Sequence, residues 1–207
     1  MMPYEWLVLL GAMISILFAV PYIRGVVKGS VKPNRVTWIM WSVAPLIAAF
    51  VEISEGVGWP ALPVFISGFI PLLVFTSSFT NQKAYWKLGP FDYACGAFSA
   101  MALLLWLVTS NPGIAIIFAI ASDFIAGIPT IVKIWAMPGT ENAYPFVAGL
   151  FNALTGIAAI SVWEFSAYAF PIYLAAINGM IIMAFQRSAF VGVSAKNQRM
   201  SGFPGYR

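Results

Sequence analysis

The sequence predicts an all-α polytopic membrane protein with seven transmembrane helices. Of its 207 residues, 61% are hydrophobic and only 9% are charged, whereas a soluble domain carries about 25% charged residues. The stretches between the charges reach the roughly 20 apolar residues that cross a ~30 Å hydrocarbon core as a helix. They lack the two-residue alternation of a transmembrane β-strand. A helical bundle in a lipid bilayer is therefore the predicted fold class.

Seven apolar segments follow one another along the chain, separated by charges, Gly and Pro. The connections at 28–34, 56–58, 81–83, 111–112, 138–141 and 163–164 each carry Gly, Pro, Asn or charged residues that end one segment before the next begins. All are too short to hold a soluble domain, so a functional site has to lie among the helices. The predicted spans are about 5–24, 35–54, 60–80, 91–109, 112–136, 143–163 and 167–187.

The segments contain a weak internal repeat. A shift of 108 residues superposes Pro21 on Pro129, late in the first and fifth spans, and Pro63 on Pro171, near the start of the third and seventh. The fourth span has no counterpart, and equivalent spans run in the same direction. These observations predict two parallel triple-helix bundles joined by a linker helix, a three-plus-one-plus-three arrangement. The predicted units are the bundles at 4–80 and 112–187, the linker helix at 88–110 and a basic cytoplasmic tail at 188–207.

The charged residues predict the orientation in the membrane. With seven spans, all eleven Lys and Arg residues fall on one side and four acids on the other. Positive charge near helix ends stays in the cytoplasm, so the amino terminus is expected outside and the carboxyl terminus inside. No basic region precedes the first span, which argues against a cleaved signal peptide. We expect a multi-pass protein of the cell (inner) membrane, with a disordered tail from Ser188 near anionic lipid.

The composition excludes several kinds of site. The chain has no His, one Cys and seven acidic residues, which removes His-based zinc sites, Ser-His-Asp triads and disulfide frameworks. No basic face with interleaved aromatic residues accompanies the net charge of +4, so no nucleic acid is expected as a partner. An intramembrane enzyme using Asp92 and Asp123 is disfavoured because Asp92 starts a helix at the cytoplasmic side. We expect no enzyme, no cofactor and no metal.

Three short stretches share the pattern of one transporter family. Residues 128–133 (Ile-Pro-Thr-Ile-Val-Lys) are followed by Gly-Thr-Glu at 139–141 and Tyr-Pro-Phe at 144–146, residues 20–24 read Val-Pro-Tyr-Ile-Arg, and 176–179 read Ala-Ile-Asn-Gly. They resemble the SWEET and PQ-loop transporters, in which one proline ends the first helix of a triplet and a second opens the next helix. The resemblance implies that Asn178 lines a substrate site. It also implies gate or hinge roles for Pro21, Pro129, Pro145 and Pro33.

The sequence departs from that family in three places. Thr37 stands where a fourth gate proline is expected, so Pro33 or Pro45 would have to substitute. Ile70 stands where the family carries an asparagine opposite Asn178, and the sixth span has no tryptophan. These departures leave the predicted fold unaffected and widen the expected solutes beyond sugars.

Three polar side chains are predicted near the bilayer midplane, about ten to twelve residues from a helix end: Asp123, Asn152 and Asn178. A charged side chain there costs at least ~2.5–3.5 kcal/mol on insertion scales, so Asp123 marks a candidate site. It would serve as a proton site or accept a substrate hydroxyl. Alternatively it is a buried, protonated acid bonded to a neighbouring helix, or one satisfied by Ser122 and the backbone. The two asparagines either line the site or join helices.

Two tryptophans, Trp38 and Trp41, lie one helical turn apart near the cytoplasmic end of the second span. They are candidate substrate-binding residues, because paired indoles can stack on a ring-shaped ligand such as a sugar or a vitamin. The alternative is an interfacial aromatic belt. That belt is the expected role of Trp6, Trp59, Trp86 and Trp163.

The sequence therefore predicts a transporter that moves a small polar solute, sugar-like or another small metabolite, by alternating access at a midplane site. Coupling to a proton through Asp123 is one option. The alternative function is a seven-helix membrane receptor or ligand-binding protein without transport; a retinal protein is excluded because the last span lacks a central lysine. The expected partners are the solute and the lipid bilayer, and a single chain could form the pathway, with an oligomer left open.

Overall fold

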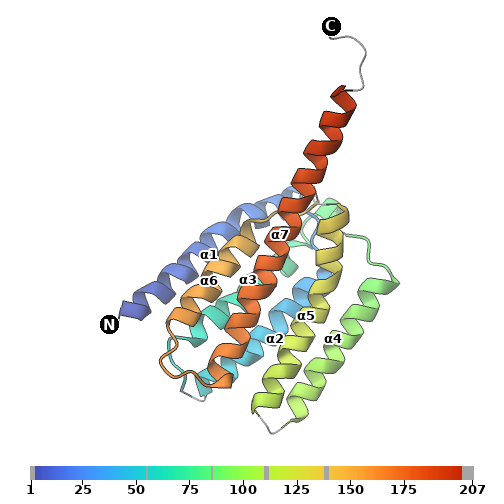
Figure 1. Ribbon diagram of the computed structural model, residues 1–207. Helices are drawn as coiled ribbons and strands as arrows, with labels where there is room; N and C mark the ends of the chain where they lie inside the picture. Colours follow the sequence, from blue (N-terminus) through green and yellow to red (C-terminus); the bar gives the residue numbers. More distant parts are fainter. Residues whose placement is uncertain (1–2, 55, 85, 110–111, 138–139, 202–207) are drawn as a thin grey trace.

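The computed structural model describes residues 3–201 except 55, 85, 110–111 and 138–139. The described residues form seven α-helices and one short 3-10 helix (Figure 1). The helices are α1 (Pro3–Lys28), α2 (Arg35–Ser54), α3 (Ala61–Ser77), η1 (Gln82–Ala84), α4 (Pro90–Val108), α5 (Pro112–Ala136), α6 (Tyr144–Ala158) and α7 (Phe165–Ser201).

Three segments are long and apolar enough to cross a membrane, namely Glu5–Lys28, Ile116–Ala136 and Ala167–Arg187. Shorter apolar helices cover Arg35–Phe50, Ala61–Ser77 and Tyr144–Ala158. The described residues are therefore helical as predicted, and three of the helices have the length and composition of membrane spans. α2 and α5 have the predicted bounds, whereas other ends differ, most clearly in α6, which ends at Ala158 instead of residue 163, and in α7, which ends at Ser201 instead of residue 187.

Two prolines that the sequence places late in the first and fifth spans, Pro21 and Pro129, lie inside α1 and α5. α1 continues for seven residues beyond Pro21 to Lys28, and α5 continues for seven residues beyond Pro129 to Ala136. A proline removes one backbone hydrogen bond, which a membrane helix tolerates when its neighbours support the chain. Both prolines therefore lie within their helices, as the predicted spans of 5–24 and 112–136 place them.

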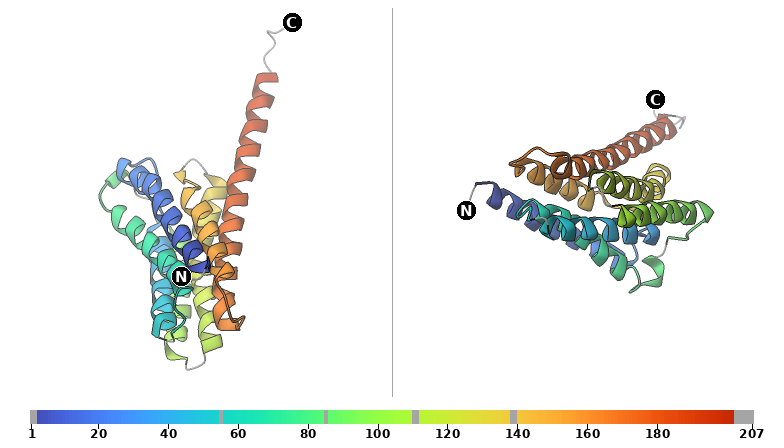
Figure 2. Two further views of the ribbon diagram at one scale, coloured as in Figure 1. Left: turned by 90° about the vertical axis from the view of Figure 1, so that its left-hand side faces the viewer. Right: turned by 90° about the horizontal axis from the view of Figure 1, so that it is seen from below.

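The final stretch, predicted to be disordered from Ser188, is helical as far as Ser201. α7 continues without a break and extends beyond the rest of the bundle toward the carboxyl terminus (Figures 1 and 2). The sequence from Ser188 to Ser201 has no proline and includes the helix-favouring residues Ala, Lys, Gln, Arg and Met. Those propensities extend the helix that the apolar span begins.

The helices contact one another in the same pattern in two sets of three. α3 packs against both α1 and α2, and α7 packs against both α5 and α6. Between the sets, α1 packs along α6 and α2 along α5, while α4 packs mainly on α5 at the side of the molecule (Figure 2). The shift of 108 residues also carries the last residue of α1, Lys28, onto the last residue of α5, Ala136.

Hydrogen bonds join three connections at one end of the bundle, here called the basic end. Lys32 in the first connection donates its N–H to the carbonyl of Thr140 in the last of the three, at 3.1 Å. Asn34 Nδ2 donates to Asp92 Oδ1 at 2.6 Å, at the start of α4. Arg35 Nε donates to Ser78 Oγ at 3.0 Å, just after α3. The connections between helices 1 and 2, 3 and 4, and 5 and 6 therefore meet, together with the basic residues that they carry.

Candidate functional site

A cavity of about 80 Å³ lies between the two sets of helices. α1, α2 and α3 form one side of its wall, and α5, α6 and α7 form the other. Most of the lining is apolar, with a few polar groups, as is usual for small-molecule sites. All five side chains predicted to bind substrate contribute to this one cavity: Trp38, Trp41, Asp123, Asn152 and Asn178.

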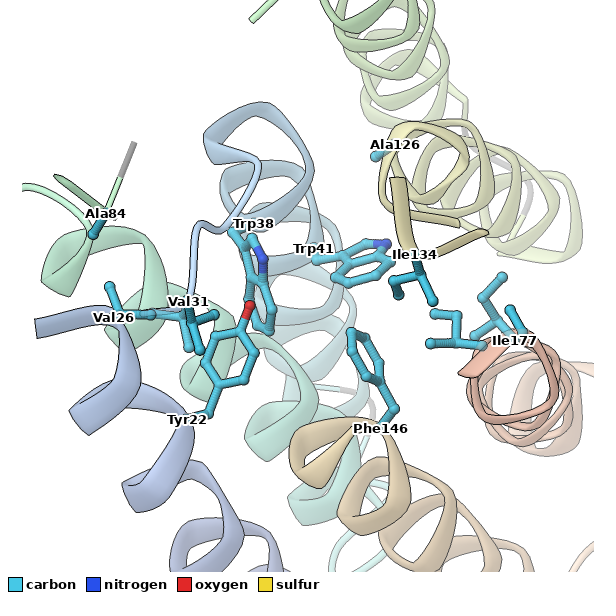
Figure 3. Close-up of a cluster of buried hydrophobic side chains, with 13 residues drawn as sticks. Tyr22, Val26, Val31, Trp38, Trp41, Ala84, Ala126, Ile134, Phe146 and Ile177 are labelled. Atoms are coloured by element: carbon cyan, nitrogen blue, oxygen red, sulfur yellow. The ribbon is translucent and has the colours of Figure 1, made fainter. Parts of the chain in front are cut away.

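Three aromatic rings form one part of the cavity wall (Figure 3). Trp38 and Trp41 from α2 are only 2% and 8% exposed. Their ring centroids lie 5.6 Å apart, and Phe146 from α6 lies 6.3 Å from Trp38 and 6.0 Å from Trp41. A tryptophan of an interfacial belt would face lipid, as the exposed Trp6 and Trp163 can. The buried pair thus does not fit the belt alternative.

Asp123 places a carboxylate at the cavity from the middle of α5 and is only 3% exposed. Its Oδ2 accepts a hydrogen bond from the Tyr173 hydroxyl of α7 at 2.7 Å. Its backbone carbonyl accepts another from Trp41 Nε1 at 3.0 Å. Ser122 does not satisfy the acid, because its side chain and carbonyl meet Ser99 of α4 instead. Among the described residues, no Lys or Arg forms an ion pair with Asp123.

The two asparagines line the cavity from α6 and α7. Asn152 Nδ2 donates to the carbonyl of Pro63 in α3 at 2.9 Å, and its Oδ1 is buried with no partner among the described residues. Asn178 Nδ2 donates to the carbonyl of Leu174 in its own helix at 2.8 Å. Asn152 therefore joins two helices across the molecule, whereas Asn178 is free to present its oxygen elsewhere.

The four candidate hinge prolines are not gathered at one place. Pro145, in the first turn of α6, lines the cavity. Pro129 is buried within α5, Pro21 is exposed on α1, and Pro33 is buried in the first connection. Pro45, which the sequence offered as a substitute hinge, does line the cavity from α2, as does Pro71 from α3.

A second cluster of buried charges lies at the basic end, centred on Glu141. Lys133 Nζ contacts Glu141 Oε1 at 2.5 Å and also donates to the carbonyl of Lys32. The Tyr22 hydroxyl donates to Glu141 Oε2 at 2.5 Å. Burial raises the pKa of the Glu141 carboxyl, and the Lys133 ammonium opposes that effect. The cluster joins α1, the first connection and α5, and the Tyr22 ring lies 5.1 Å from that of Trp38 at the cavity wall (Figure 3).

Sequence reasoning missed Tyr173 and two lining residues, Phe146 and Ser15. The internal repeat contained a signal for the last two. The shift of 108 residues that relates the prolines also relates Trp38 to Phe146 and Ser15 to Asp123. Both members of each pair line the cavity, so the repeat could have extended the predicted site.

The described residues contain no group of three or more His, Cys, Asp or Glu side chains that could hold a metal ion. No protein-family model matches the chain, and no curated protein or solved structure matches it either. The described side chains of the site provide an aromatic wall, two amides and one carboxylate that no Lys or Arg of the described residues pairs with.

Proposed function

We propose that this chain is a membrane transporter that moves a small polar solute, sugar-like or another small metabolite, by alternating access. Two triple-helix bundles, α1–α3 and α5–α7, would rock against each other around the cavity, with α4 as the linker. The observation that carries the proposal is a cavity between two sets of helices with the same packing pattern, to which polar side chains from the middle of the helices contribute. The resemblance to SWEET and PQ-loop transporters agrees with this arrangement.

The proposed topology has seven spans in the cell (inner) membrane. The basic end would be cytoplasmic, because positively charged loops are retained there, and the amino terminus would be outside. In the conformation described above, the contacts of the Glu141 cluster join the two bundles at the basic end, since Tyr22 belongs to α1 and Lys133 to α5. Opening the cavity toward the cytoplasm would require these contacts to separate.

Transport could be linked to a proton through Asp123. A buried carboxylate without a cation is destabilised in its charged form, so protonation and solute binding would each relieve that cost. Tyr173, the titratable side chain bonded to the carboxylate, would remain a hydrogen-bond donor in both states. Coupling follows if the solute and the proton favour different orientations of the bundles.

Uptake into proteoliposomes tests the proposal. Purified protein would be given a panel comprising a hexose, a neutral amino acid, a vitamin and a small amine, with and without a pH gradient. We expect at least one solute to accumulate in the vesicles, and Asp123→Asn to lose uptake or its response to the gradient. Glu164→Gln, at an exposed position, is the matched control and should leave uptake unchanged.

Two results would contradict the proposal in different ways. If no solute moves but one of them binds specifically, the chain is a receptor or ligand-binding protein. If uptake responds to the pH gradient equally in the wild type and in Asp123→Asn, the proton does not pass through Asp123.

A further inference from the structure

The cavity holds the carboxyl group of Asp123, and no Lys or Arg of the described residues pairs with it. Lys133 is the next basic residue along α5, ten positions away, which is about 15 Å along a helix. Its ammonium is already engaged by Glu141. Removing a carboxylate from water without a counter-charge costs several kcal/mol, so a ligand that supplies positive charge gains from this site.

The wall also offers more free acceptors than free donors. Asp123 Oδ1 has no hydrogen-bond partner among the described residues, because the Tyr173 hydroxyl engages only Oδ2. Asn178 Oδ1 has none either, since its bond uses Nδ2. Asn152 Oδ1 is buried and unpaired. An unmet buried acceptor costs ~1–3 kcal/mol, which a donor on a ligand would recover.

Most hydroxyl and indole donors around the cavity are already used by the protein. Ser15 Oγ donates to a carbonyl of α6 at 3.3 Å, and Ser67 Oγ donates to a carbonyl of its own helix at 2.7 Å. Trp41 Nε1 donates to a carbonyl of α5 at 3.0 Å. The Trp38 indole nitrogen is the exception: it is buried with no hydrogen-bond partner among the described residues, and its ring lies beside that of Tyr22. A ligand rich in acceptors therefore finds few donors in this wall.

The rings of Trp38, Trp41 and Phe146 complete the chemistry of the wall. Faces of aromatic rings attract cations, Trp most strongly, and their surfaces bury apolar groups. These rings come from α2 and α6, whereas Asp123 comes from α5. A ligand held between them would meet rings and a carboxylate at the same time.

We propose that the cavity binds a small organic ammonium ion, a primary or secondary amine on a compact apolar body. The N–H groups would meet the free oxygens of Asp123 and Asn178, the positive charge would balance the carboxylate, and the apolar body would lie against the aromatic rings. Anions are disfavoured by the carboxylate, and a neutral polyol would bring several acceptors to a wall in which Trp38 Nε1 is the one unpartnered indole donor among the described residues. This inference rests on the proposed function in taking the cavity as the solute site.

Three probes of nearly the same size separate charge from shape: isobutylammonium, isobutanol and isobutyrate. Their binding to the purified full chain would be measured by isothermal titration calorimetry. A charge-assisted hydrogen bond is worth ~1.5–3 kcal/mol, so we expect isobutylammonium to bind about 10- to 100-fold more tightly than isobutanol. Isobutyrate should not bind. If isobutanol binds as tightly as isobutylammonium, or isobutyrate binds more tightly, the inference is overturned. This test needs only the wild-type protein.

A variant and a fourth probe locate the effect. Asp123→Asn should weaken isobutylammonium by at least about tenfold and leave isobutanol within about twofold, while Glu164→Gln should change neither. Tetramethylammonium has the charge but no N–H donors, and it should bind more weakly than isobutylammonium. Undiminished binding of isobutylammonium to a folded Asp123→Asn protein would show that this carboxylate does not recognise the charge.

Transport measurements distinguish the failure of this inference from that of the proposed function. If isobutylammonium neither binds nor moves but another solute of the panel is transported, the ligand class is wrong and the transporter stands. If isobutylammonium binds as expected but does not cross proteoliposome membranes, and no other solute does, the ligand class stands and the chain is a receptor.

Discussion

Two buried carboxylates in the second half of the chain, Asp123 and Glu141, each contact a tyrosine, but among the described residues only Glu141 has a cation beside it. Each accepts a hydrogen bond from a tyrosine hydroxyl, Asp123 from Tyr173 at 2.7 Å and Glu141 from Tyr22 at 2.5 Å. Glu141 also has the Lys133 ammonium at 2.5 Å, whereas no cation accompanies Asp123 in the described part of the chain. We call Glu141, whose charge Lys133 balances, a framework acid. The carboxylate of Asp123 instead remains available to a ligand that enters the cavity.

Their places in the fold explain this difference. Glu141 lies in a connection at the basic end, where Lys133 can reach it from the last turn of α5. Asp123 lies near the middle of the same helix, where a second charge would be costly unless it performed a function. A tyrosine alone does not distinguish the two roles, since both acids have one.

The largest effect is expected from removing the cation of the framework pair. Lys133→Met would leave Glu141 buried and uncompensated, and breaking a buried ion pair in this way costs ~3–5 kcal/mol. The free energy of unfolding in detergent, measured by chemical denaturation, should fall by that amount. Lys87→Met, at an exposed position, is the control and should change it little.

The double variant Lys133→Met with Glu141→Gln sharpens this test. Removing both charges should recover part of the lost stability, because the penalty comes from the orphaned charge. A single variant Lys133→Met that is as stable as the wild type would show that the pair is not part of the framework, and the comparison with Asp123 would lose its basis.

The sequence predicted one of these acids and not the other for physical reasons. A carboxylate in a long apolar segment stands out in composition, so Asp123 could be identified without a structure. Glu141 follows a Gly in a polar connection and looks like an ordinary loop residue. Its partner Tyr22 is 119 positions away, and only the packing of α1 against the fifth connection brings them together.

The same limit applies to the fold. Apolar length predicted the helices and their order, because crossing a membrane constrains every span in the same way. The predicted ends of the helices were less accurate. The first span was expected to end at about residue 24, whereas α1 continues to Lys28, and the tail beyond Ser188 was expected to be disordered where α7 continues. Local helix propensity decides where such helices end, and a hydropathy pattern does not report helix propensity.

A smaller effect is expected from removing each tyrosine hydroxyl. Tyr22→Phe should cost ~1.5–3 kcal/mol, because the donor is fully buried and meets a charged acceptor. Tyr173→Phe should cost about 1 kcal/mol or less, since water in the cavity can replace its bond to Asp123. Denaturation of the two variants side by side measures the difference. Equal losses would mean that both acids are equally isolated from water.

Neutralising the acid at the cavity should stabilise the protein slightly. Asp123→Asn removes a charge that has no cation, and the amide oxygen can still accept the hydrogen bond from Tyr173. We expect the free energy of unfolding to stay level or to rise by about 1 kcal/mol, while uptake or binding falls. A variant that is both strongly destabilised and unable to bind would place Asp123 with Glu141 among the framework acids.

The smallest effect tests whether Asn178 belongs with Asp123 at the cavity. A Cβ at Gly149 would lie 2.7 Å from Asn178 Oδ1, so Gly149→Ala should displace that amide, whereas a Cβ at Gly179 would meet no atom within 4 Å. Both variants exchange a helical glycine for alanine and so share a gain in helix propensity of up to ~1 kcal/mol. We expect Gly149→Ala to weaken ligand binding by about threefold to tenfold, the loss of one neutral hydrogen bond, and Gly179→Ala to leave it unchanged. Equal affinities in the two variants would remove Asn178 from the recognition site and leave the carboxylate of Asp123 as its polar centre.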